Sequence, residues 1–295
     1  MKLTELKGFV PALGTPLDKD GNLYKKSYKA QAEKMIEKGA VAVLSMGSMG
    51  QQAFIREETC VEVAETAVEA AAGRVPVLVG AMDNSIVRAK KRMASMEHLD
   101  LTAFVFTTPY YEVDSKDQVL TYFEELANST SHGFILYDLP GVTNFKITYD
   151  MVQELEHRVK NLVGIKSADL QMHRKIRLNQ DLSHIQTFYS GLDTFDIAYP
   201  WGIGCILDGM LPATPNNTEK MIRALDRGDR EEAAKALSNI VELRDKFIGW
   251  DLWPAFSATM NLLGFEGFFA PDWATEVSDG TKEEIKEELK KIGEL

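Results

Sequence analysis

Short apolar runs recur along the first two thirds of the chain, and longer amphipathic segments separate them. Eight of these runs are nearly continuous and rich in β-branched and aromatic residues, which is typical of strands buried on both faces of a parallel sheet. The pattern therefore predicts an α/β protein. The predicted strands cover residues 9–13, 41–46, 75–79, 103–107, 134–137, 162–165, 185–189 and 204–207.

The segments between the runs repeat their apolar residues at helical spacing. One apolar face spans residues 28–36, and Gly39 can end that helix in the left-handed conformation. Alternating strands and helices imply right-handed parallel crossovers, and eight such units can close into a (β/α)8 TIM barrel, which we expect in preference to a doubly wound open sheet. Further helices are predicted over residues 56–72, 85–96, 116–127, 149–159 and 169–179, with a shorter one after Gly191.

The pattern changes after residue 214, where only helical segments follow. These cover residues 219–227, 230–247 and 253–263, and Thr281-x-x-Glu284 resembles a capping box that opens a last helix. No low-complexity linker precedes this part of the chain. We therefore predict a single domain over residues 1–295, made of a barrel over 1–214 and a C-terminal helical extension over 215–295.

Composition and charge narrow the class of protein. Hydrophobic residues make up 45% of the 295 residues, which argues against a disordered chain, and 44 acidic against 33 basic residues give a net charge of −11. An acidic surface disfavours nucleic-acid binding. No run approaches the ~20 apolar residues of a membrane span, and no long apolar segment near the start suggests a secretory signal. We therefore expect a cytoplasmic protein without nucleic-acid or membrane partners.

The candidate chemistry lies where the predicted strands end, because the C-terminal ends of parallel barrel strands meet at one mouth. Lys166 directly follows an apolar strand, and burial there would favour its neutral amine, which can form a Schiff base with a carbonyl. Tyr137 ends another strand and could transfer a proton beside that imine. Ser48 lies in a glycine-flanked loop whose hydroxyl and backbone N–H groups could hold a carboxylate. Each also has a structural interpretation: a lysine reaching solvent, a buried aromatic and an ordinary turn.

Metal chemistry has little support in the sequence. The two cysteines do not form a C-x-x-C pair, and the five histidines are scattered, with no pair four residues apart. We therefore expect no metal site.

Further motifs occur in a fixed order around these residues. The ordered set resembles the dihydrodipicolinate synthase / N-acetylneuraminate lyase family of class I aldolases over roughly residues 8–210. The resemblance implies a (β/α)8 barrel with a helical C-terminal extension, usually assembled as a homotetramer that is a dimer of dimers. The motifs are Thr15-Pro16 with Asp20-Gly21, Gly47-Ser48-Met49-Gly50-Gln51, Gly73-Arg74-Val75-Pro76-Val77 with Gly80, Thr108-Pro109-Tyr110-Tyr111, Leu136-Tyr137-Asp138-Leu139-Pro140, Gly164-Ile165-Lys166 and Ser190-Gly191-Leu192-Asp193.

The resemblance also implies roles for individual residues. Lys166 takes the position of the family's lysine, which forms a Schiff base with pyruvate or a related 2-oxo acid and needs no other cofactor. Tyr137 takes the position of the catalytic tyrosine, and Tyr111 that of a tyrosine that reaches across a subunit interface into a proton relay. Ser48, also a catalytic hydroxyl in the family, would hold the pyruvate carboxylate together with the Met49 backbone. Further candidate contacts with the substrate are Gly191, Asp193, Ile206, Thr143 and Asp138.

Several positions depart from the family's usual pattern, among them Asp193-Thr194 where sialic acid lyases often have Asp-Glu, and Leu207 and Asp208 where small polar residues are common. Met49 stands where a second hydroxyl is usual, Gln51 where a glutamate is usual, and Asp138 where asparagine is more frequent. Val142 replaces the arginine with which synthases bind the carboxylate of aspartate semialdehyde, and valine cannot make a bidentate carboxylate contact. The last departure argues against a true dihydrodipicolinate synthase.

We therefore expect a Schiff-base lyase or aldolase that cleaves or condenses a 2-oxo acid, with pyruvate and an aldehyde as its small-molecule partners. The aldehyde could derive from a sugar. One alternative is a dehydratase that acts on a sugar-derived 2-oxo acid through the same imine. Another is a barrel that binds a 2-oxo acid without turnover, which the departures at Met49 and Gln51 motivate.

Overall fold

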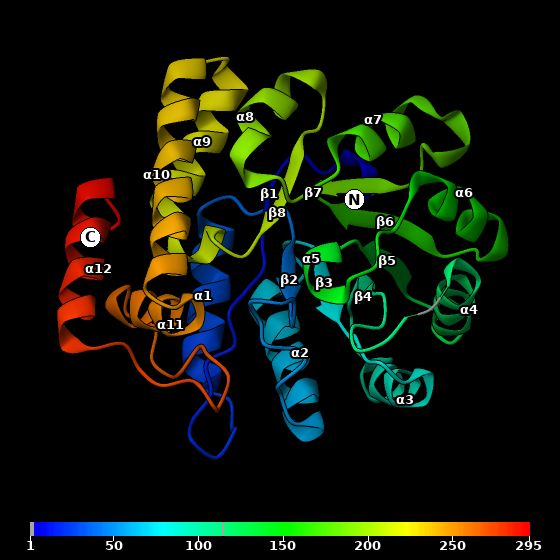
Figure 1. Cartoon of the computed structure of the whole chain (residues 1–295), viewed down its shortest axis with the longest axis horizontal. Helices are drawn as coiled ribbons and strands as arrows, with labels where there is room; N and C mark the ends of the chain where they lie inside the picture. Colours follow the sequence, from blue (N-terminus) through cyan, green and yellow to red (C-terminus); the bar gives the residue numbers. More distant parts are fainter. Residues whose placement is uncertain (1–2, 114) are drawn as a thin grey trace.

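The computed structural model describes residues 3–113 and 115–295, and these residues form a barrel of eight parallel strands with helices around it (Figure 1). Residues 1, 2 and 114 of the predicted barrel lie outside the described residues. The strands are β1 (Gly8–Pro11), β2 (Val43–Ser45), β3 (Val77–Gly80), β4 (Ala103–Thr107), β5 (Gly133–Tyr137), β6 (Leu162–Ser167), β7 (Gln186–Tyr189) and β8 (Cys205–Asp208).

The strands neighbour one another in the order β1-β8-β7-β6-β5-β4-β3-β2. The two ends of this series also meet, because Leu13 N donates a hydrogen bond to Leu44 O (2.9 Å) and Val41 N donates one to Phe9 O (3.0 Å). The predicted TIM barrel is therefore confirmed against the open sheet.

Helices follow most strands and cover the outside of the barrel (Figure 1). Short 3-10 helices are η1 (Leu3–Glu5), η2 (Gln180–Leu182), η3 (Leu192–Thr194), η4 (Tyr199–Trp201) and η5 (Leu211–Ala213). The α-helices of the barrel are α1 (Lys25–Glu37), α2 (Glu57–Ala71), α3 (Ile86–Met96), α4 (Lys116–Ala127), α5 (Pro140–Thr143), α6 (Tyr149–Arg158), α7 (Leu170–Leu178) and α8 (Phe195–Ala198).

Local rules predict most of these boundaries. Each observed strand overlaps its predicted run and differs from it by at most two residues at either end. Helix α1 ends at Glu37, and Gly39 takes a φ of +95°, as its predicted role at the end of that helix requires. The short helix predicted after Gly191 is observed as three short turns, η3, α8 and η4.

The C-terminal extension gathers on one side of the barrel, next to α8, with the last helix outermost (Figure 1). Its helices are α9 (Pro215–Arg227), α10 (Arg230–Gly249), α11 (Leu252–Leu262) and α12 (Asp279–Ile292). Two predicted boundaries are wrong. Helix α9 begins at Pro215 rather than at residue 219, and α12 is capped by Ser278, whose hydroxyl accepts from Thr281 N, so no capping box starts at Thr281.

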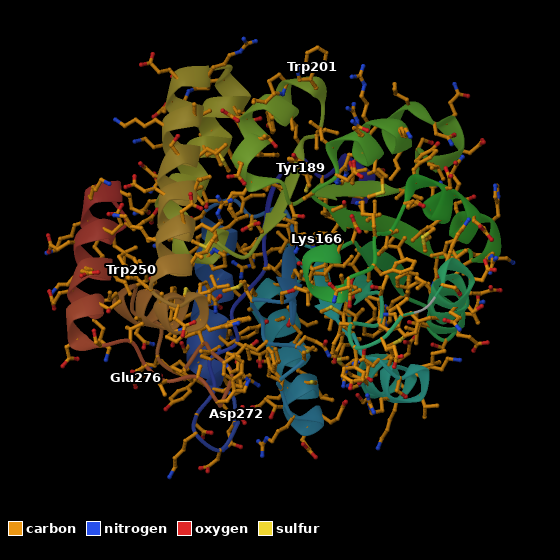
Figure 2. The ribbon with its side chains drawn as sticks, viewed as in Figure 1. Lys166, Tyr189, Trp201, Trp250, Asp272 and Glu276 are labelled. Atoms are coloured by element: carbon orange, nitrogen blue, oxygen red, sulfur yellow. The ribbon has the colours of Figure 1, made fainter. Side chains whose placement is uncertain are left out.

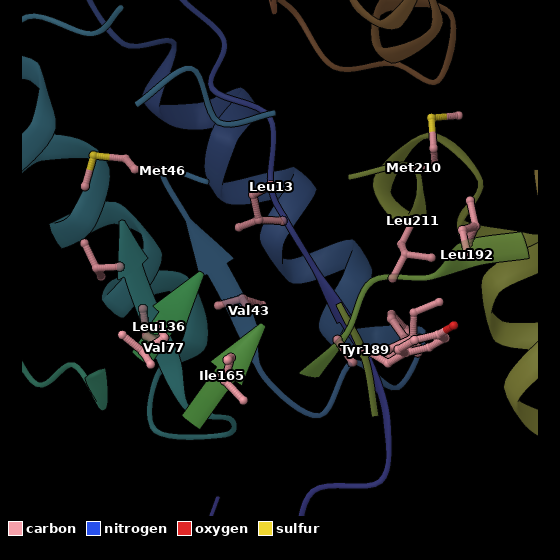
Figure 3. Close-up of a cluster of buried hydrophobic side chains, with 14 of the residues drawn as sticks. Leu13, Val43, Met46, Val77, Leu136, Ile165, Tyr189, Leu192, Met210 and Leu211 are labelled. Atoms are coloured by element: carbon pink, nitrogen blue, oxygen red, sulfur yellow. The ribbon is translucent and has the colours of Figure 1, made fainter. Parts of the chain in front are cut away.

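The buried apolar side chains fall into two layers because successive strand residues point to opposite faces. One layer fills the barrel and includes Val10, Leu44, Val105, Ile135 and Tyr137. The other lies between the strands and the surrounding helices, and Figure 3 shows Leu136 and Ile165 within it. Tyr137 and its predecessor Leu136 thus belong to opposite layers, which places Tyr137 inside the barrel.

Within residues 3–113 and 115–295, no helix has both the length and the apolar character needed to cross a membrane.

Candidate active site

Strands β5 and β6 bring the two central candidate residues into register. Phe134 pairs with Leu162, but the register then shifts, so that Ile135 pairs with Gly164 and Tyr137 pairs with Lys166. Without this shift, Ile165 would stand opposite Tyr137. Irregularities of this kind re-aim side chains in sheets and are frequent beside active sites. Here the shift sets the lysine beside the tyrosine on the inner face of the barrel.

Lys166 and Tyr137 are in direct contact at the centre of the molecule. The Lys166 Nζ lies 3.7 Å from the centroid of the Tyr137 ring, a cation–π distance, and both residues are only 5% exposed. Figure 2 shows Lys166 over the ring of strands, well inside the outline of the molecule. The alternative in which this lysine reaches out to solvent is therefore wrong.

Ser48 completes this group from the loop after β2. Its Oγ lies 3.4 Å from the Tyr137 hydroxyl, so either group can donate a hydrogen bond to the other. The structure thus brings together three of the four residues for which a catalytic role was predicted, from separate parts of the chain.

The loop that carries Ser48 is strained and strongly braced. Met46 and Gln51 adopt positive φ values of 52° and 59°, which non-glycine residues rarely do. Thr15 Oγ1 donates to Gly50 O (2.7 Å), and Gln51 Nε2 donates to Thr15 O (2.8 Å). Gln51, which replaces the family's usual glutamate, is buried and braces the loop rather than reaching the lysine.

Met49 reaches from the same loop toward the end of β8. A Cβ on Gly209 would lie 2.1 Å from Met49 Cγ, so this side chain occupies the space above Gly209. The neighbouring Asp208 was not selected from the sequence as a site residue. Burial raises the pKa of Asp208, although the positive charges of Lys166 and Arg244 act in the opposite direction. The Asp208 carboxyl group, whose pKa is affected by the charge of Lys166, thus lies at the same end of the barrel.

Tyr111 lies apart from the central group. Its side chain is 88% exposed, while its backbone N–H donates to Asn84 Oδ1 (3.1 Å), which also accepts from Tyr110 N (2.7 Å). Asn84 therefore fixes the backbone of the Tyr-Tyr pair, while the Tyr111 side chain is exposed to solvent.

The candidates after β7 are engaged within the protein. Asp193 forms a bidentate ion pair with Arg244 of α10 (2.7 and 2.8 Å), and this hydrogen bonding lowers the pKa of Asp193. Gly191 has no room for a side chain, because a Cβ there would lie 2.2 Å from the Tyr189 hydroxyl. The Asp193–Arg244 pair ties the loop after β7 to the C-terminal extension.

Three further candidates for substrate binding also make their contacts within the protein. The Thr143 hydroxyl donates to the carbonyl oxygens of Leu139 and Phe145 (both 3.2 Å). Ile206 is fully buried in the layer between strands and helices. Asp138 accepts hydrogen bonds from Ser167 Oγ (2.7 Å) and from the Ile147 backbone (3.0 Å), on the side of β5 away from Tyr137.

Sequence reasoning missed the partners of Asp138. Ser167 follows Lys166 directly, and Lys146 forms an ion pair with Asp138 from the segment after α5. Strand alternation was the signal that could have found Ser167, because Asp138 and Ser167 each follow a residue that faces the interior. Among the residues that the structure describes, no group of three or more His, Cys, Asp and Glu side chains could hold a metal ion.

Comparisons with known proteins agree with the barrel fold and with the family that the sequence motifs resemble. The sequence matches the Dihydrodipicolinate synthetase family over residues 5–292. The 4-hydroxy-tetrahydrodipicolinate synthase of Idiomarina loihiensis is 28% identical over 244 residues, or 81% of each chain. That of Brucella abortus is 30% identical over 203 residues, or 68% of this chain and 69% of the relative. The solved structure of Proteus mirabilis N-acetylneuraminate lyase covers 98% of this chain and 99% of its own, with a TM-score of 0.89 at 18% identity, and so shares the fold.

These relatives bear on one expectation from the sequence. Val142 argued against a dihydrodipicolinate synthase, but both relatives carry the name of 4-hydroxy-tetrahydrodipicolinate synthase, so the comparisons give that exclusion no support. The family match extends through the C-terminal helices, beyond the motifs from which the resemblance was drawn. The chain therefore belongs to the dihydrodipicolinate synthetase family, whose members are class I aldolase-type lyases.

Proposed function

We propose that this protein is a Schiff-base lyase that cleaves or condenses a 2-oxo acid through Lys166, with pyruvate and an aldehyde as its partners. One observation supports this most directly: a buried lysine amine lies 3.7 Å from the ring of a tyrosine whose hydroxyl is within 3.4 Å of Ser48. A buried amine beside a hydroxyl pair suits imine formation followed by proton transfer.

The cleavage direction begins when Lys166 Nζ adds to the C2 carbonyl and water leaves, which forms a protonated imine. Tyr137 takes the proton of the C4 hydroxyl, the C3–C4 bond breaks, and its electron pair moves into the imine to give an enamine and an aldehyde. A proton then returns to C3, and water hydrolyses the imine to release pyruvate and the free lysine. Ser48 relays the proton from Tyr137, with Tyr111 as a further member of the relay.

The carboxylate of the 2-oxo acid is anchored by the Ser48 hydroxyl and by backbone N–H groups of its loop. Met49 offers no second hydroxyl, and its side chain lies over Gly209 instead. Burial raises the pKa of Asp208, the carboxyl group at the end of β8, against the opposing effects of its hydrogen bond from Met210 N and of the charge of Lys166. The Ser48 hydroxyl and the N–H groups of its loop can hold an anion although the whole molecule carries a net charge of −11.

The decisive experiment is incubation with pyruvate and borohydride, followed by mass analysis of the peptides. A reduced pyruvyl group on Lys166 is the expected result, and a Lys166→Ala variant should carry none. Lys160, exposed just before the same strand, gives a matched control in which Lys160→Ala keeps the adduct. An unmodified Lys166 in the native chain would refute the proposal. Adduct formation that is unchanged in a chelator would support a metal-independent reaction.

The aldehyde partner is the finer part of the proposal. Val142 is 58% exposed and offers no ligand for the carboxylate of aspartate semialdehyde, which favours an uncharged or sugar-derived aldehyde. Condensation assays with pyruvate should include aspartate semialdehyde, because the named relatives make it the main competitor. Turnover of aspartate semialdehyde alone would contradict this choice. Loss of water from a sugar-derived 2-oxo acid would identify a dehydratase, and an adduct without any turnover would identify a binding protein.

We also propose that the protein assembles as a homotetramer, with Tyr111 acting across a subunit interface. The exposure of Tyr111 (88%) supports a role outside its own barrel. Sedimentation should give the mass of four chains, and Tyr111→Phe should slow turnover without dissociating the assembly. A monomer with full activity would refute both statements.

A further inference from the structure

The residues that follow Tyr137 and Lys166 are joined to each other behind the catalytic pair. Ser167 Oγ donates to Asp138 Oδ2 (2.7 Å), and Asp138 N donates to Lys166 O (2.8 Å). Because strand residues alternate, these side chains point toward the helices while Tyr137 and Lys166 point into the barrel. Figure 3 shows the same outer layer at Leu136 and Ile165, two residues before Asp138 and Ser167.

The Asp138 carboxylate is buried and every part of it is engaged. The residue is 4% exposed, its Oδ1 accepts from Ile147 N (3.0 Å), and its Oδ2 accepts from Ser167 and from the Lys146 ammonium. A buried charge held by a cation and by further donors has a strongly preferred position, since any movement leaves part of it unpaired. Asp138 therefore resists displacement of the end of β5.

A second acidic residue extends this network to helix α7. Lys146 Nζ also lies 3.2 Å from Asp169 Oδ2, and Asp169 N donates to Ser167 Oγ (3.0 Å). Asp169 in turn caps α7 by accepting from Met172 N (2.9 Å). The ends of β5 and β6, the segment after α5 and the start of α7 are thus held together.

We propose that Asp138, with Ser167 and Lys146, is a positioning residue that fixes the Tyr137 hydroxyl relative to the Lys166 amine. The inference rests on the proposed function. An asparagine, which the family more often has here, could not form the ion pair with Lys146. A displacement of about 1 Å between reacting groups can cost ~100-fold in rate, so a constraint one residue behind each partner acts directly on the chemistry.

The same two strands offer a matched control at their other end. Asn161, just before β6, donates from Nδ2 to Ala127 O and His132 O (both 2.9 Å) and so ties the start of β6 to the start of β5. Asn161→Ala should destabilise the β5–β6 pair without moving the ends that carry Tyr137 and Lys166. It separates a general loss of stability from a loss of positioning.

The test follows exchange of the pyruvate methyl hydrogens for deuterium in heavy water by NMR. Exchange requires the Lys166 imine, loss of a C3 proton to give the enamine, and return of a deuteron from solvent, so it needs no aldehyde. Asp138→Asn should lower the maximal exchange rate about 10- to 100-fold with little change in KM, and Ser167→Ala should follow in the same direction. Asn161→Ala should stay within about twofold of the native rate per folded molecule.

A second pair of variants covers the case in which Asp138→Asn does not fold. Lys146 has a side chain that is 40% exposed, so Lys146→Ala should fold, and it should lower the exchange rate about 10-fold. Lys146→Arg keeps the charge and should restore most of that loss. The inference is wrong if the variants that fold exchange as fast as Asn161→Ala, or if arginine gives no rescue. A native chain that neither exchanges nor forms the adduct would overturn the proposed function as well, so the two failures are distinguishable.

Discussion

Two regions of this molecule are built by different means. The mouth, which we define as the C-terminal ends of the strands with residues 46–52 and 138–147, depends on strain and on polar contacts between distant parts of the chain. The C-terminal extension consists of helices, and several of their ends follow local rules, such as the Asp229 cap on α10 and Gly293 after α12, although Asp251 before α11 also takes a positive φ of 73°. In the extension, packing and caps hold most helix ends, whereas the mouth must also hold reactive groups in fixed positions.

This difference shows where structure is maintained for function. Met46 and Gln51 keep positive φ values beside Ser48, and Gln51 Oε1 and both polar side-chain atoms of Gln52 are buried without a hydrogen-bond partner among the described residues. Such features cost free energy and persist only where the surroundings impose them. Mutations should therefore act with different signs and sizes in the two regions.

The two regions should differ most in how their stability responds when a glycine is replaced by alanine. A Cβ on Gly80, at the end of β3, would lie 1.9 Å from the carbonyl oxygen of Met46, which is backbone and has little freedom to move. We expect Gly80→Ala to lower the free energy of unfolding by about 3 kcal/mol or more. A Cβ added to Gly249, the last residue of α10, would meet no atom of the described residues within 4 Å, so Gly249→Ala should be stabilising by about 0.5–1 kcal/mol.

Urea unfolding of both variants, monitored by circular dichroism, measures the two effects. The comparison fails if Gly80→Ala is neutral, or if both substitutions change stability in the same direction.

A buried histidine should make the region behind the mouth sensitive to acid. His173 of α7 donates from Nε2 to Ser167 O (2.8 Å), and its Nδ1 is buried with no hydrogen-bond partner in the described part of the chain. Burial lowers the pKa of His173 from 6.5 to about 4, against the opposing effects of the hydrogen bond to Ser167 and the charge of Asp169.

The direction of the pH dependence follows from this shift. Between about pH 4 and 6.5 the unfolded chain binds a proton that the folded chain does not bind, so stability falls as the pH drops through this window and levels off below it. The loss due to His173 should reach about 3 kcal/mol. His173→Gln keeps a donor for Ser167 but cannot titrate, so the difference between the two proteins should shrink toward pH 4. Parallel stability–pH curves would contradict this assignment.

The extension depends on one distant contact as well. The Glu294 carboxylate accepts from the backbone N–H groups of Asn216 and Asn217 (both 2.9 Å) in the first turn of α9. Glu294→Ala leaves these donors unpaired and should lower the free energy of unfolding by about 2 kcal/mol. Glu294→Gln keeps one acceptor oxygen, so its stability should lie between that of the native chain and that of Glu294→Ala. Glu287, exposed on α12, is the matched control, and equal effects of Glu287→Ala and Glu294→Ala would contradict the role of this cap.

These contacts explain how far the sequence alone can lead. The strands, most helices and the barrel follow from apolar spacing, because each depends on neighbours in the chain. Lys166, Tyr137 and Ser48 were found because they end strands or lie in the loop after one. The start of α9 was misplaced because its cap is Glu294, 77 residues away along the chain from Asn217.

The site was less predictable than the fold for the same reason. Asp193 was expected at the substrate, but its ion pair with Arg244 joins residues 51 positions apart. Asp138 was also expected at the substrate, although it lies on the opposite face of its strand from Tyr137. Residue type and position along a strand showed that these groups matter, but their partners are set by tertiary packing.

The smallest expected effect tests the local rules within the extension itself. Ser278 caps α12, since its Oγ accepts from Thr281 N (3.1 Å), whereas the sequence pattern placed the start of the helix at Thr281. Ser278→Ala should cost about 1 kcal/mol because one N–H of the first turn loses its acceptor. Thr281→Ala removes only the hydroxyl that shares a hydrogen bond with Ser278 Oγ (3.0 Å), and it should cost less. Urea unfolding of both variants measures the two effects. Equal losses would mean that the two hydroxyls act as a pair, and a larger loss at Thr281 would restore the capping box that the sequence suggested.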